Sequence, residues 1–166
     1  MKTLMLLRHA KSSWKNDRLG DHERPLNKRG KAAAPAMGRL VLEKNVVPDL
    51  IYSSTAVRAH TTAKAVAKAC GYRGEIRTSE QLYLATAGTL MEHAERRVED
   101  SVNRLMLVAH NPGMGNLVQM LSKKHEPFPT GALAVFEVPI DSWRDLALGL
   151  DFKMTALWRP RELNES

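Results

Sequence analysis

The sequence predicts an α/β fold in which helices cover both faces of a central sheet, and three observations support this. Short apolar runs alternate along the chain with longer segments of helical periodicity. The apolar runs are continuous, as in strands that are buried on both faces. The 166 residues, 43% hydrophobic and 26% charged, fit one globular domain, which we expect over residues 1–158. A polar, mobile C-terminal tail is expected over 159–166.

The first strand is expected at Leu4–Leu7, four apolar residues that are followed at once by Arg8 and His9. A buried helical turn would show the same short pattern. In open α/β sheets, ligands bind in the crevice outside the carboxyl ends of the strands. Arg8 and His9 are therefore candidate site residues, although two polar residues after a strand are more often part of a solvated loop.

The next segment, residues 11–26, is polar and rich in turn formers, and we expect it to be a loop of a length typical of active sites. Asn27 is a plausible N-cap for the helix that follows. Pro35 lies inside the apolar stripe of that helix, where it should bend the helix or delay its regular part. A second strand is expected over 50–52, and it ends in three hydroxyl residues at 53–55.

Arg58 falls in the first turn of a helix that the periodicity predicts over 56–69. A cation at this position opposes the helix dipole, which favours an anion there. An arginine in this place makes sense if an anion lies beside it. For an isolated residue, an exposed and mildly unfavourable arginine is the simpler interpretation.

The second half of the chain repeats the opening pattern. A continuous apolar strand is expected over 104–109, and it ends at His110, before the turn Asn111-Pro112-Gly113. The other expected elements are a short edge strand at 75–78, an amphipathic helix at 86–100, a short helix through Leu117, Met120 and Leu121, and strands at 132–138 and 152–158.

The charge of the chain excludes some classes of function. The net charge is +7, but lysine and arginine are spread over the whole sequence, without an arginine-rich tail or a zinc-finger spacing, so nucleic-acid binding is disfavoured. No run is long and apolar enough to span a membrane, and the N-terminus lacks the features of a secretory signal, so we expect a cytoplasmic protein. The single cysteine, Cys70, is expected in the core.

Arg8, His9, Arg58 and His110 would form one strongly cationic pocket if their strand ends converge. Such a pocket suits phosphate, because guanidinium groups match its oxygens and a neutral imidazole can attack phosphorus. His9 is the better nucleophile candidate, with one ring nitrogen held protonated by a local acceptor. Arg8 and Arg58 would take up the charge of the phosphoryl oxygens, and His110 would donate to the same phosphate.

Four motifs resemble those of the histidine phosphatase superfamily, which has an R-H-G motif and also contains the cofactor-dependent phosphoglycerate mutases. They are Leu6-Leu7-Arg8-His9-Ala10; Arg24-Pro25-Leu26-Asn27 with Gly30; Ser53-Ser54 leading to Arg58-Ala59 and Thr62-Ala63; and Val108-Ala109-His110-Asn111-Pro112-Gly113. The short chain is similar to the SixA-type phosphohistidine phosphatases in particular. The resemblance implies a phosphoglycerate mutase-like, three-layer α/β/α fold with a mainly parallel sheet. It also implies a phosphohistidine intermediate on His9, a phosphate pocket of Arg8, His9, Arg58 and His110, no cofactor and no metal.

Two positions depart from that pattern. Ala10 stands where the family usually has glycine, which raises the question whether the backbone needs a positive φ there. No glutamate matches the general acid of larger members, Glu80 and Glu92 being out of register, whereas Asp21 matches a position that SixA-type members use. Asp21 could equally be a turn residue after Gly20. Because a phosphorylated imidazole leaves more easily than an alkoxide, the missing acid favours P–N substrates.

The leading hypothesis is therefore an enzyme that removes phosphate from phosphohistidine on a signalling or phosphotransfer protein. A small-molecule phosphomonoesterase or mutase of the same superfamily is the alternative within catalysis. A weakly catalytic phosphate-binding module is the alternative outside it. The expected partners are a phosphorylated protein or a small phosphate ester, with no nucleic acid and no membrane.

Overall fold

A computed structural model describes residues 1–163, which form a six-stranded sheet between two layers of helices. The strand order is β3-β2-β4-β1-β5-β6. The first four strands of that order are parallel, and β5 runs antiparallel to both of its neighbours. The strands are β1 (Lys2–Arg8), β2 (Leu50–Ser54), β3 (Ile76–Ser79), β4 (Arg104–Ala109), β5 (Leu133–Val138) and β6 (Lys153–Trp158). The mainly parallel sheet and the edge position of β3 are as the sequence predicts.

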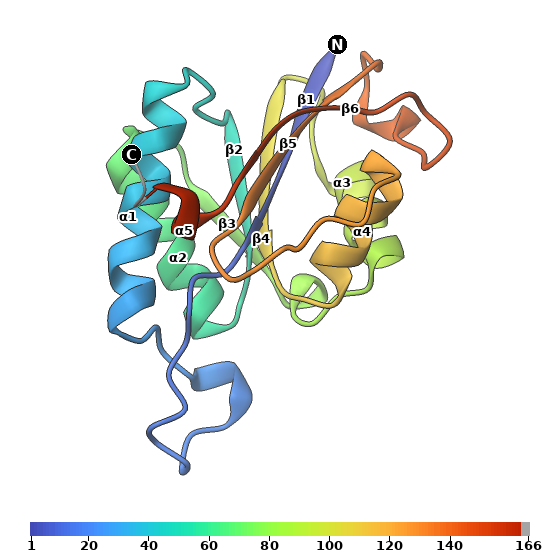
Figure 1. Ribbon diagram of the computed structural model, residues 1–166. Helices are drawn as coiled ribbons and strands as arrows, with labels where there is room; N and C mark the ends of the chain where they lie inside the picture. The colour runs from blue at the N-terminus through green and yellow to red at the C-terminus, as the bar shows by residue number, and fades with distance from the viewer. Residues whose placement is uncertain (164–166) are drawn as a thin grey trace.

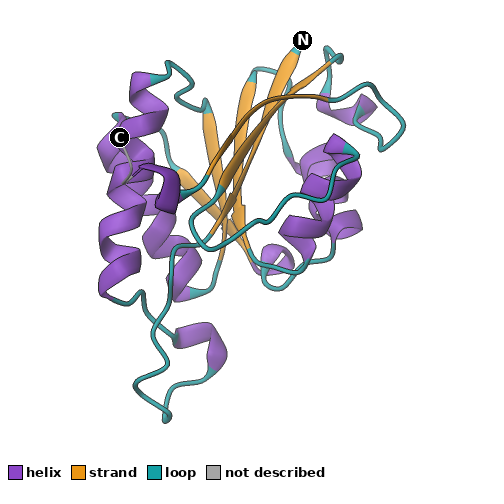
Figure 2. Cartoon of the chain, viewed as in Figure 1, coloured by secondary structure: helices purple, strands orange, loops and turns teal. Residues whose placement is uncertain are grey.

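The helices lie on both sides of this sheet (Figures 1 and 2). α1 and α2 cover one face together with the short α5, and α3 and α4 cover the other. The helices are α1 (Lys28–Glu43), α2 (Val57–Cys70), α3 (Ala87–Arg97), α4 (Gly113–Ser122) and α5 (Pro160–Leu163), with 3-10 turns η1 (Asp21–Glu23), η2 (Glu80–Leu82) and η3 (Trp143–Asp145). The three-layer α/β/α prediction is confirmed. Across residues 1–163, no helix has the length and apolar character that crossing a membrane requires.

The core explains why the strand sequences are continuously apolar. Leu4 and Leu6 of β1 point to the side of α3 and α4, whereas Met5 and Leu7 pack among the residues of α1 and α2. All four are fully buried, so successive side chains, which point to opposite faces of a strand, meet a hydrophobic layer on either side. The strand therefore has no solvent-facing side, and it meets polar surroundings only where it ends.

α1 begins as the sequence predicts, because the Asn27 side chain accepts a hydrogen bond from the Gly30 amide at 2.9 Å. A Cβ atom on Gly30 would lie 2.1 Å from the Lys11 carbonyl oxygen, which accepts a hydrogen bond from the Asn27 amide. Only glycine allows this close approach of α1 to the segment after β1. Pro35 does not delay the helix, which is continuous from Lys28 to Glu43.

The short helix predicted through Leu117, Met120 and Leu121 is α4, in which Leu117 and Leu121 are buried and Met120 is 47% exposed. The expectation of a mobile C-terminal tail is wrong for its first residues. The first part of the C-terminal tail is ordered, because Arg159 binds the Pro127 carbonyl and pairs with Glu126 and Glu162. The rest of the predicted tail, 164–166, lies outside the described residues.

Candidate active site

The sheet brings the two predicted histidines together. β1 and β4 are adjacent and parallel, with Arg8 opposite Ala109, so both strands end at the same level. The His9 amide then donates to the Ala109 carbonyl at 3.1 Å, and the ring centroids of His9 and His110 lie 5.1 Å apart. The carboxyl edge of the sheet therefore holds both imidazoles side by side, as the strand-end argument predicts.

His9 is held in one tautomer. Its Nδ1 lies 2.7 Å from the Ala10 carbonyl oxygen, and because a carbonyl only accepts, Nδ1 must carry the proton. The side chain is 5% exposed, and burial, together with the charges of Arg58, Arg8 and Arg24, lowers the pKa of His9 to about 4. At neutral pH the ring is uncharged, and its Nε2 has no hydrogen-bond partner in the described part of the chain.

His110 is 1% exposed, and its Nε2 lies 2.8 Å from the Ser54 hydroxyl oxygen. Ser54 is itself anchored, because its oxygen accepts a hydrogen bond from the Ala56 amide at 3.2 Å. The other ring nitrogen, Nδ1, is buried without a hydrogen-bond partner among residues 1–163. Burial, assisted by the neighbouring His9 and Arg58, lowers the pKa of His110 to about 3. One polar atom of this ring is therefore left for a ligand.

Arg58 is 2% exposed, and the anion that its helix position calls for is Asp21. The Arg58 guanidinium donates to the Asp21 carbonyl at 2.6 Å and to its carboxylate at 2.9 Å. The Tyr83 hydroxyl donates to the same carboxylate. Burial alone would raise the pKa of Asp21, but the hydrogen bonds from Tyr83 and Arg58 and the Arg58 charge lower it to about 2. Asp21 is thus a carboxylate, bound at the guanidinium that a phosphate would use.

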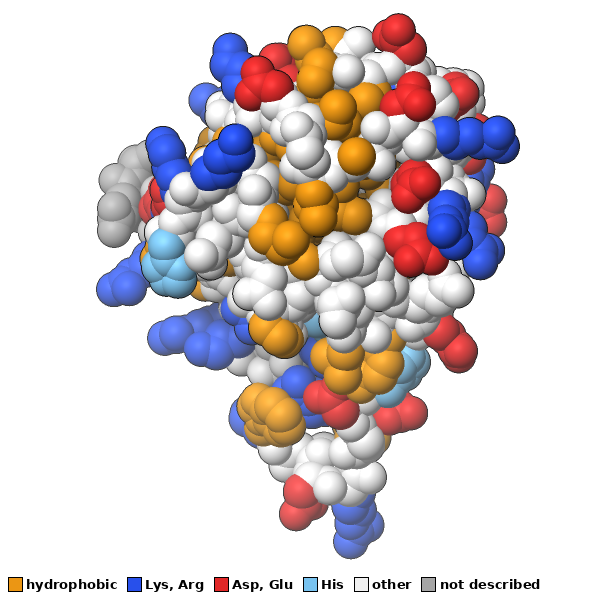
Figure 3. Space-filling model, turned by 90° about the vertical axis from the view of Figure 1, so that its right-hand side faces the viewer, with side chains coloured by type: hydrophobic (Ala, Val, Ile, Leu, Met, Phe, Trp, Pro, Cys, Tyr) orange, Lys and Arg blue, Asp and Glu red, His pale blue; other side chains and the backbone are white. Residues whose placement is uncertain are grey.

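The loop 11–26 delivers Asp21 to the cluster, and Arg24 organises that loop. The Arg24 guanidinium donates to Ser12 at 2.9 Å and to Asp21 at 3.2 Å, and it stacks on the Trp14 ring at 3.4 Å. A backbone bridge between Ser12 and Leu26 closes the base of the loop. In the space-filling view, this segment is the narrow projection at the lower end of the molecule (Figure 3).

Arg8 extends from the end of β1 and donates to the Phe128 carbonyl at 3.2 Å. Burial, with the charge of Arg58, lowers the pKa of Arg8 from its usual value. The Nε atoms of both arginines are buried and have no hydrogen-bond partner within the described residues. The structure thus brings Arg8, His9, Arg58 and His110 to one edge of the sheet, with unused donors, and Asp21 among them.

The backbone after His9 answers the question that Ala10 raises. Ala10 is not among the described non-glycine residues with positive φ, and its side chain is fully buried. Its amide donates to the Thr62 hydroxyl at 2.9 Å, and that hydroxyl donates to the Arg58 carbonyl at 2.7 Å. Alanine therefore fits this position without backbone strain, and Thr62 ties the His9 turn to α2.

Glycine is required at another motif position, Gly113. A Cβ atom there would lie 1.8 Å from the carbonyl oxygen of Ala85, so the turn after His110 packs directly against the backbone that follows Tyr83. The Asn111 side chain anchors the same turn, since it donates to the Phe128 carbonyl at 3.0 Å and accepts from the Gly115 amide at 3.0 Å.

Sequence reasoning missed the parts that Tyr83, Ser54 and Arg24 play. Ser54 and Arg24 could have been identified from the sequence, because both lie in the motifs quoted above. No motif or pattern in the sequence around Tyr83 indicated that it belongs to the site. No three His, Cys, Asp or Glu side chains gather as potential metal ligands anywhere in residues 1–163. What the cluster offers is a set of guanidinium and imidazole donors around a neutral imidazole nitrogen, an arrangement suited to a tetrahedral oxyanion and to attack on it.

The chain is similar to known proteins in both sequence and fold. The chain matches the profile of the histidine phosphatase superfamily (branch 1) over residues 4–117. It is 30% identical over 152 residues to an uncharacterised chloroplastic protein of Arabidopsis thaliana, covering 87% of this chain and 70% of the relative. An uncharacterised protein of Mycobacterium tuberculosis is 33% identical over 154 residues, with 86% and 93% covered.

A solved structure is similar along almost the whole chain. It is the crystal structure of a protein from Agrobacterium tumefaciens that is assigned as the phosphohistidine phosphatase SixA. It superposes with a TM-score of 0.80 at 28% sequence identity, and the match covers 96% of this chain and 98% of the other.

Proposed function

Because this chain belongs to the histidine phosphatase superfamily (branch 1) and is a phosphatase, we propose that it hydrolyses phosphohistidine on a signalling or phosphotransfer protein. The reaction would pass through a covalent phosphohistidine on His9. One observation carries the proposal: Nδ1 of His9 is protonated and bound to the Ala10 carbonyl, which leaves Nε2 neutral and without a partner in the described structure, among Arg8, Arg58 and His110.

In the first step, the Nε2 lone pair of His9 forms a bond to phosphorus while the P–N bond of the substrate breaks. The electron pair of that bond leaves with the substrate imidazole, whose other ring nitrogen carries a proton before the attack, so a neutral imidazole departs without a proton from the protein. Arg58 and Arg8 neutralise the phosphoryl oxygens, and Nδ1 of His110 is the ring atom available to hydrogen-bond them, because Ser54 occupies Nε2. In the second step, water attacks phosphorus, the P–Nε2 bond breaks, and inorganic phosphate is released.

Asp21 is better suited to the second step than to the first. With a pKa of about 2 it is ionised in the free protein, so it has no proton to give to a leaving group at neutral pH. As a carboxylate it can accept a proton from the attacking water. The incoming phosphoryl group either takes Arg58 donors from Asp21 or binds next to it, at the Arg58 Nε that has no partner among the described residues.

The carboxylates support a P–N substrate over an alkyl phosphate. Glu80 and Glu92, the other acids considered from the sequence, do not contact the cluster: Glu80 is exposed, and Glu92 pairs with Arg96 on the outer face of α3. An alkoxide leaving group needs a proton donor, whereas a phosphorylated imidazole leaves more readily without one. The small-molecule phosphomonoesterase remains the alternative, and substrate preference separates the two.

The test compares a phosphohistidine peptide with aryl and alkyl phosphates and traps the intermediate. Rapid quenching in base should give an acid-labile phosphate label on the protein, which His9→Ala abolishes and the matched His125→Ala, on an exposed histidine, retains. An undiminished label in His9→Ala would refute the assignment of the nucleophile. Alkyl phosphates turned over faster than phosphohistidine would favour the small-molecule alternative. EDTA should leave the rate unchanged if no metal takes part. The cytoplasmic location and the protein partner stay predictions from the sequence.

A further inference from the structure

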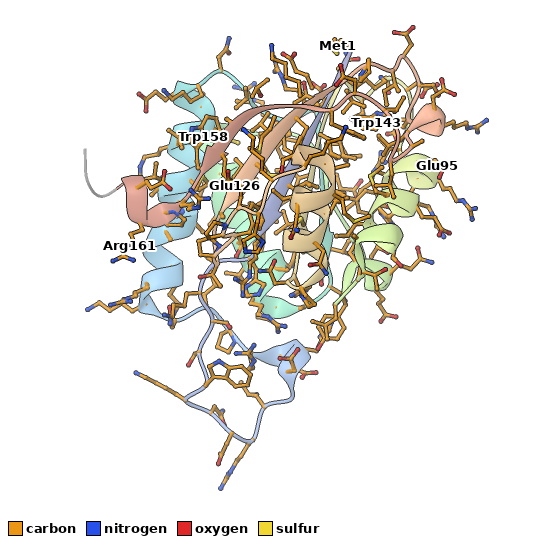
Figure 4. All side chains as sticks on the ribbon, turned by 45° about the vertical axis from the view of Figure 1, so that its right-hand side comes forward. Met1, Glu95, Glu126, Trp143, Trp158 and Arg161 are labelled. Atoms are coloured by element: carbon orange, nitrogen blue, oxygen red, sulfur yellow. The ribbon has the colours of Figure 1, made fainter. Side chains whose placement is uncertain are left out.

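A second concave surface lies beside the site. It is an open groove of about 1170 Å³ between α1, the segment 127–130 and α5. Figure 1 shows α5, in dark red, lying against α1, and Figure 4 labels Arg161 on α5 and Glu126 on the neighbouring segment. None of the catalytic steps described above uses this groove.

The rim of the groove carries unneutralised positive charge. Lys11, Arg29 and Arg161 line it, all three are exposed, and none forms an ion pair with a described residue. Glu162 and Glu126 both pair with Arg159, at 2.8 Å and 3.0 Å, so these three residues together carry one negative charge, which offsets only part of the positive charge of the rim. The groove therefore presents three free cations and suits an anionic ligand.

Between these cations the groove is lined mainly by apolar side chains. These side chains form its floor and include Ala33 and Ala36 of α1, Pro127 and Phe128, and Pro160 of α5. A small inorganic anion would gain nothing from this floor, since it needs donors on several sides. A peptide gains from both parts, because its apolar atoms can lie on the floor while its acidic side chains reach the rim.

The groove lies next to the phosphate cluster. Lys11, which lines the groove, follows Ala10 in the turn that holds His9. Phe128 also lines it, and the Phe128 carbonyl accepts hydrogen bonds from Arg8 and Asn111. A chain whose phosphorylated residue occupies the cluster therefore has the groove close by.

We propose that this groove binds an acidic segment of the phosphorylated protein, next in sequence or in space to the phosphohistidine. The proposal rests on the proposed function for the identity of the phosphorylated residue. It adds the feature by which the enzyme would select its partner: glutamate or aspartate side chains that meet Lys11, Arg29 and Arg161. Exposed charges of this kind act mainly on selectivity and on the rate of encounter.

The experiment measures binding without requiring turnover. Four fluorescent peptides each carry one non-hydrolysable phosphohistidine mimic. Two have four glutamates, placed either before or after the mimic, and the other two have four serines at the same places. Kd is measured by anisotropy at low ionic strength. We expect the better of the two acidic peptides to bind about tenfold more tightly than its serine counterpart, and the difference to shrink with added salt. The double variant Arg29→Glu/Arg161→Glu should lose the preference.

The matched control is Arg39→Glu/Lys68→Glu, which makes the same change in net charge at exposed positions of α1 and α2 outside the groove, and it should keep the preference. Equal affinity for acidic and serine peptides, or a preference that survives Arg29→Glu/Arg161→Glu, would overturn the proposal. Displacement of the acidic peptide by equimolar tripolyphosphate would also overturn it, in favour of a general polyanion site.

Hydrolysis of a phosphohistidine peptide by the unmodified protein is measured separately. A groove preference without P–N hydrolysis would refute the proposed function and leave the groove as an acidic-peptide site, so the two failures are distinguishable. Aryl phosphate hydrolysis by Arg29→Glu/Arg161→Glu should equal that of the unmodified protein, which shows that the variant is folded and that its phosphate cluster is intact.

Discussion

Asp21→Asn should strengthen the binding of inorganic phosphate. In the free protein the Asp21 carboxylate lies 2.9 Å from Arg58 and occupies donors that phosphate requires. Phosphate binding must therefore either displace this carboxylate or place a second anion next to it. Asparagine keeps the shape of the side chain but removes the negative charge, so the competition for Arg58 weakens.

The size of the effect follows from the exposure of Asp21. Two unit charges about 4 Å apart interact by ~1 kcal/mol in water and by ~4 kcal/mol at an effective dielectric constant of 20. The Asp21 side chain is 40% exposed, so solvent screening places the effect near the lower end, at ~1–2 kcal/mol. The dissociation constant for phosphate should fall by a factor of about 5 to 30.

Competitive inhibition of aryl phosphate hydrolysis by phosphate, at constant ionic strength, measures this change. Asp17→Asn removes an exposed carboxylate from the same loop and serves as the control, with no change expected. Phosphate that binds Asp21→Asn equally or more weakly would refute the argument, because it would mean that the carboxylate assists the anion instead of competing with it. If Asp21 also activates water, kcat falls in the same variant while phosphate binds more tightly.

Further predictions concern the cluster, pH and packing. Arg58→Ala and His110→Ala should each lower kcat for phosphohistidine by ~10²–10³, and His9→Ala by more, in steady-state assays of folded protein. Burial, with the charge of Arg97, lowers the pKa of His93 to about 4 from the usual 6.5, so its neutral form contributes stability above pH 6.5 that is lost as pH falls toward 4. When the pH is lowered from 7 to 5, the free energy of unfolding, measured in urea, should fall by ~2 kcal/mol less in His93→Leu than in the unmodified protein. Gly113→Ala should displace the His110 turn, because its Cβ would collide with the Ala85 carbonyl, and should lower both the melting temperature and kcat; Gly149→Ala, which adds a Cβ in open space, should change neither.

The sequence could predict the strand-end histidines because each follows a run that is apolar at every position. Such a run is buried on both faces, so the first polar side chains after Leu7 and Ala109 had to lie at the edge of the sheet. The sequence could not predict that these two strands are neighbours, since β2 and β3 lie between them in the chain order. Strand order depends on which hydrophobic faces pack together, and single segments do not carry that information.

Asp21 shows a different limit. Its residue type and its place near the Arg24 motif made it a candidate, but a turn residue would look the same in sequence. Its position depends on contacts between segments far apart in the chain: Arg24 stacked on Trp14, and hydrogen bonds from Arg58 and Tyr83. The ordered start of the C-terminal tail was missed for the same reason, because two partners of Arg159, Glu126 and the Pro127 carbonyl, lie far from it in the chain.

The pairing of β1 with β4 means that the motifs around His9 and His110, although distant in the chain, can change in length only together. Arg8 lies opposite Ala109, and the histidine that follows each of them takes its place from that register. A single inserted or deleted residue in either strand would turn the following side chains to the opposite face and carry one imidazole away from the other. Only a simultaneous insertion or deletion in the other strand would bring the two imidazoles together again. Related sequences are therefore expected to differ in length in their loops, the projecting segment 11–26 among them, while these two strands keep their spacing to the histidines unchanged.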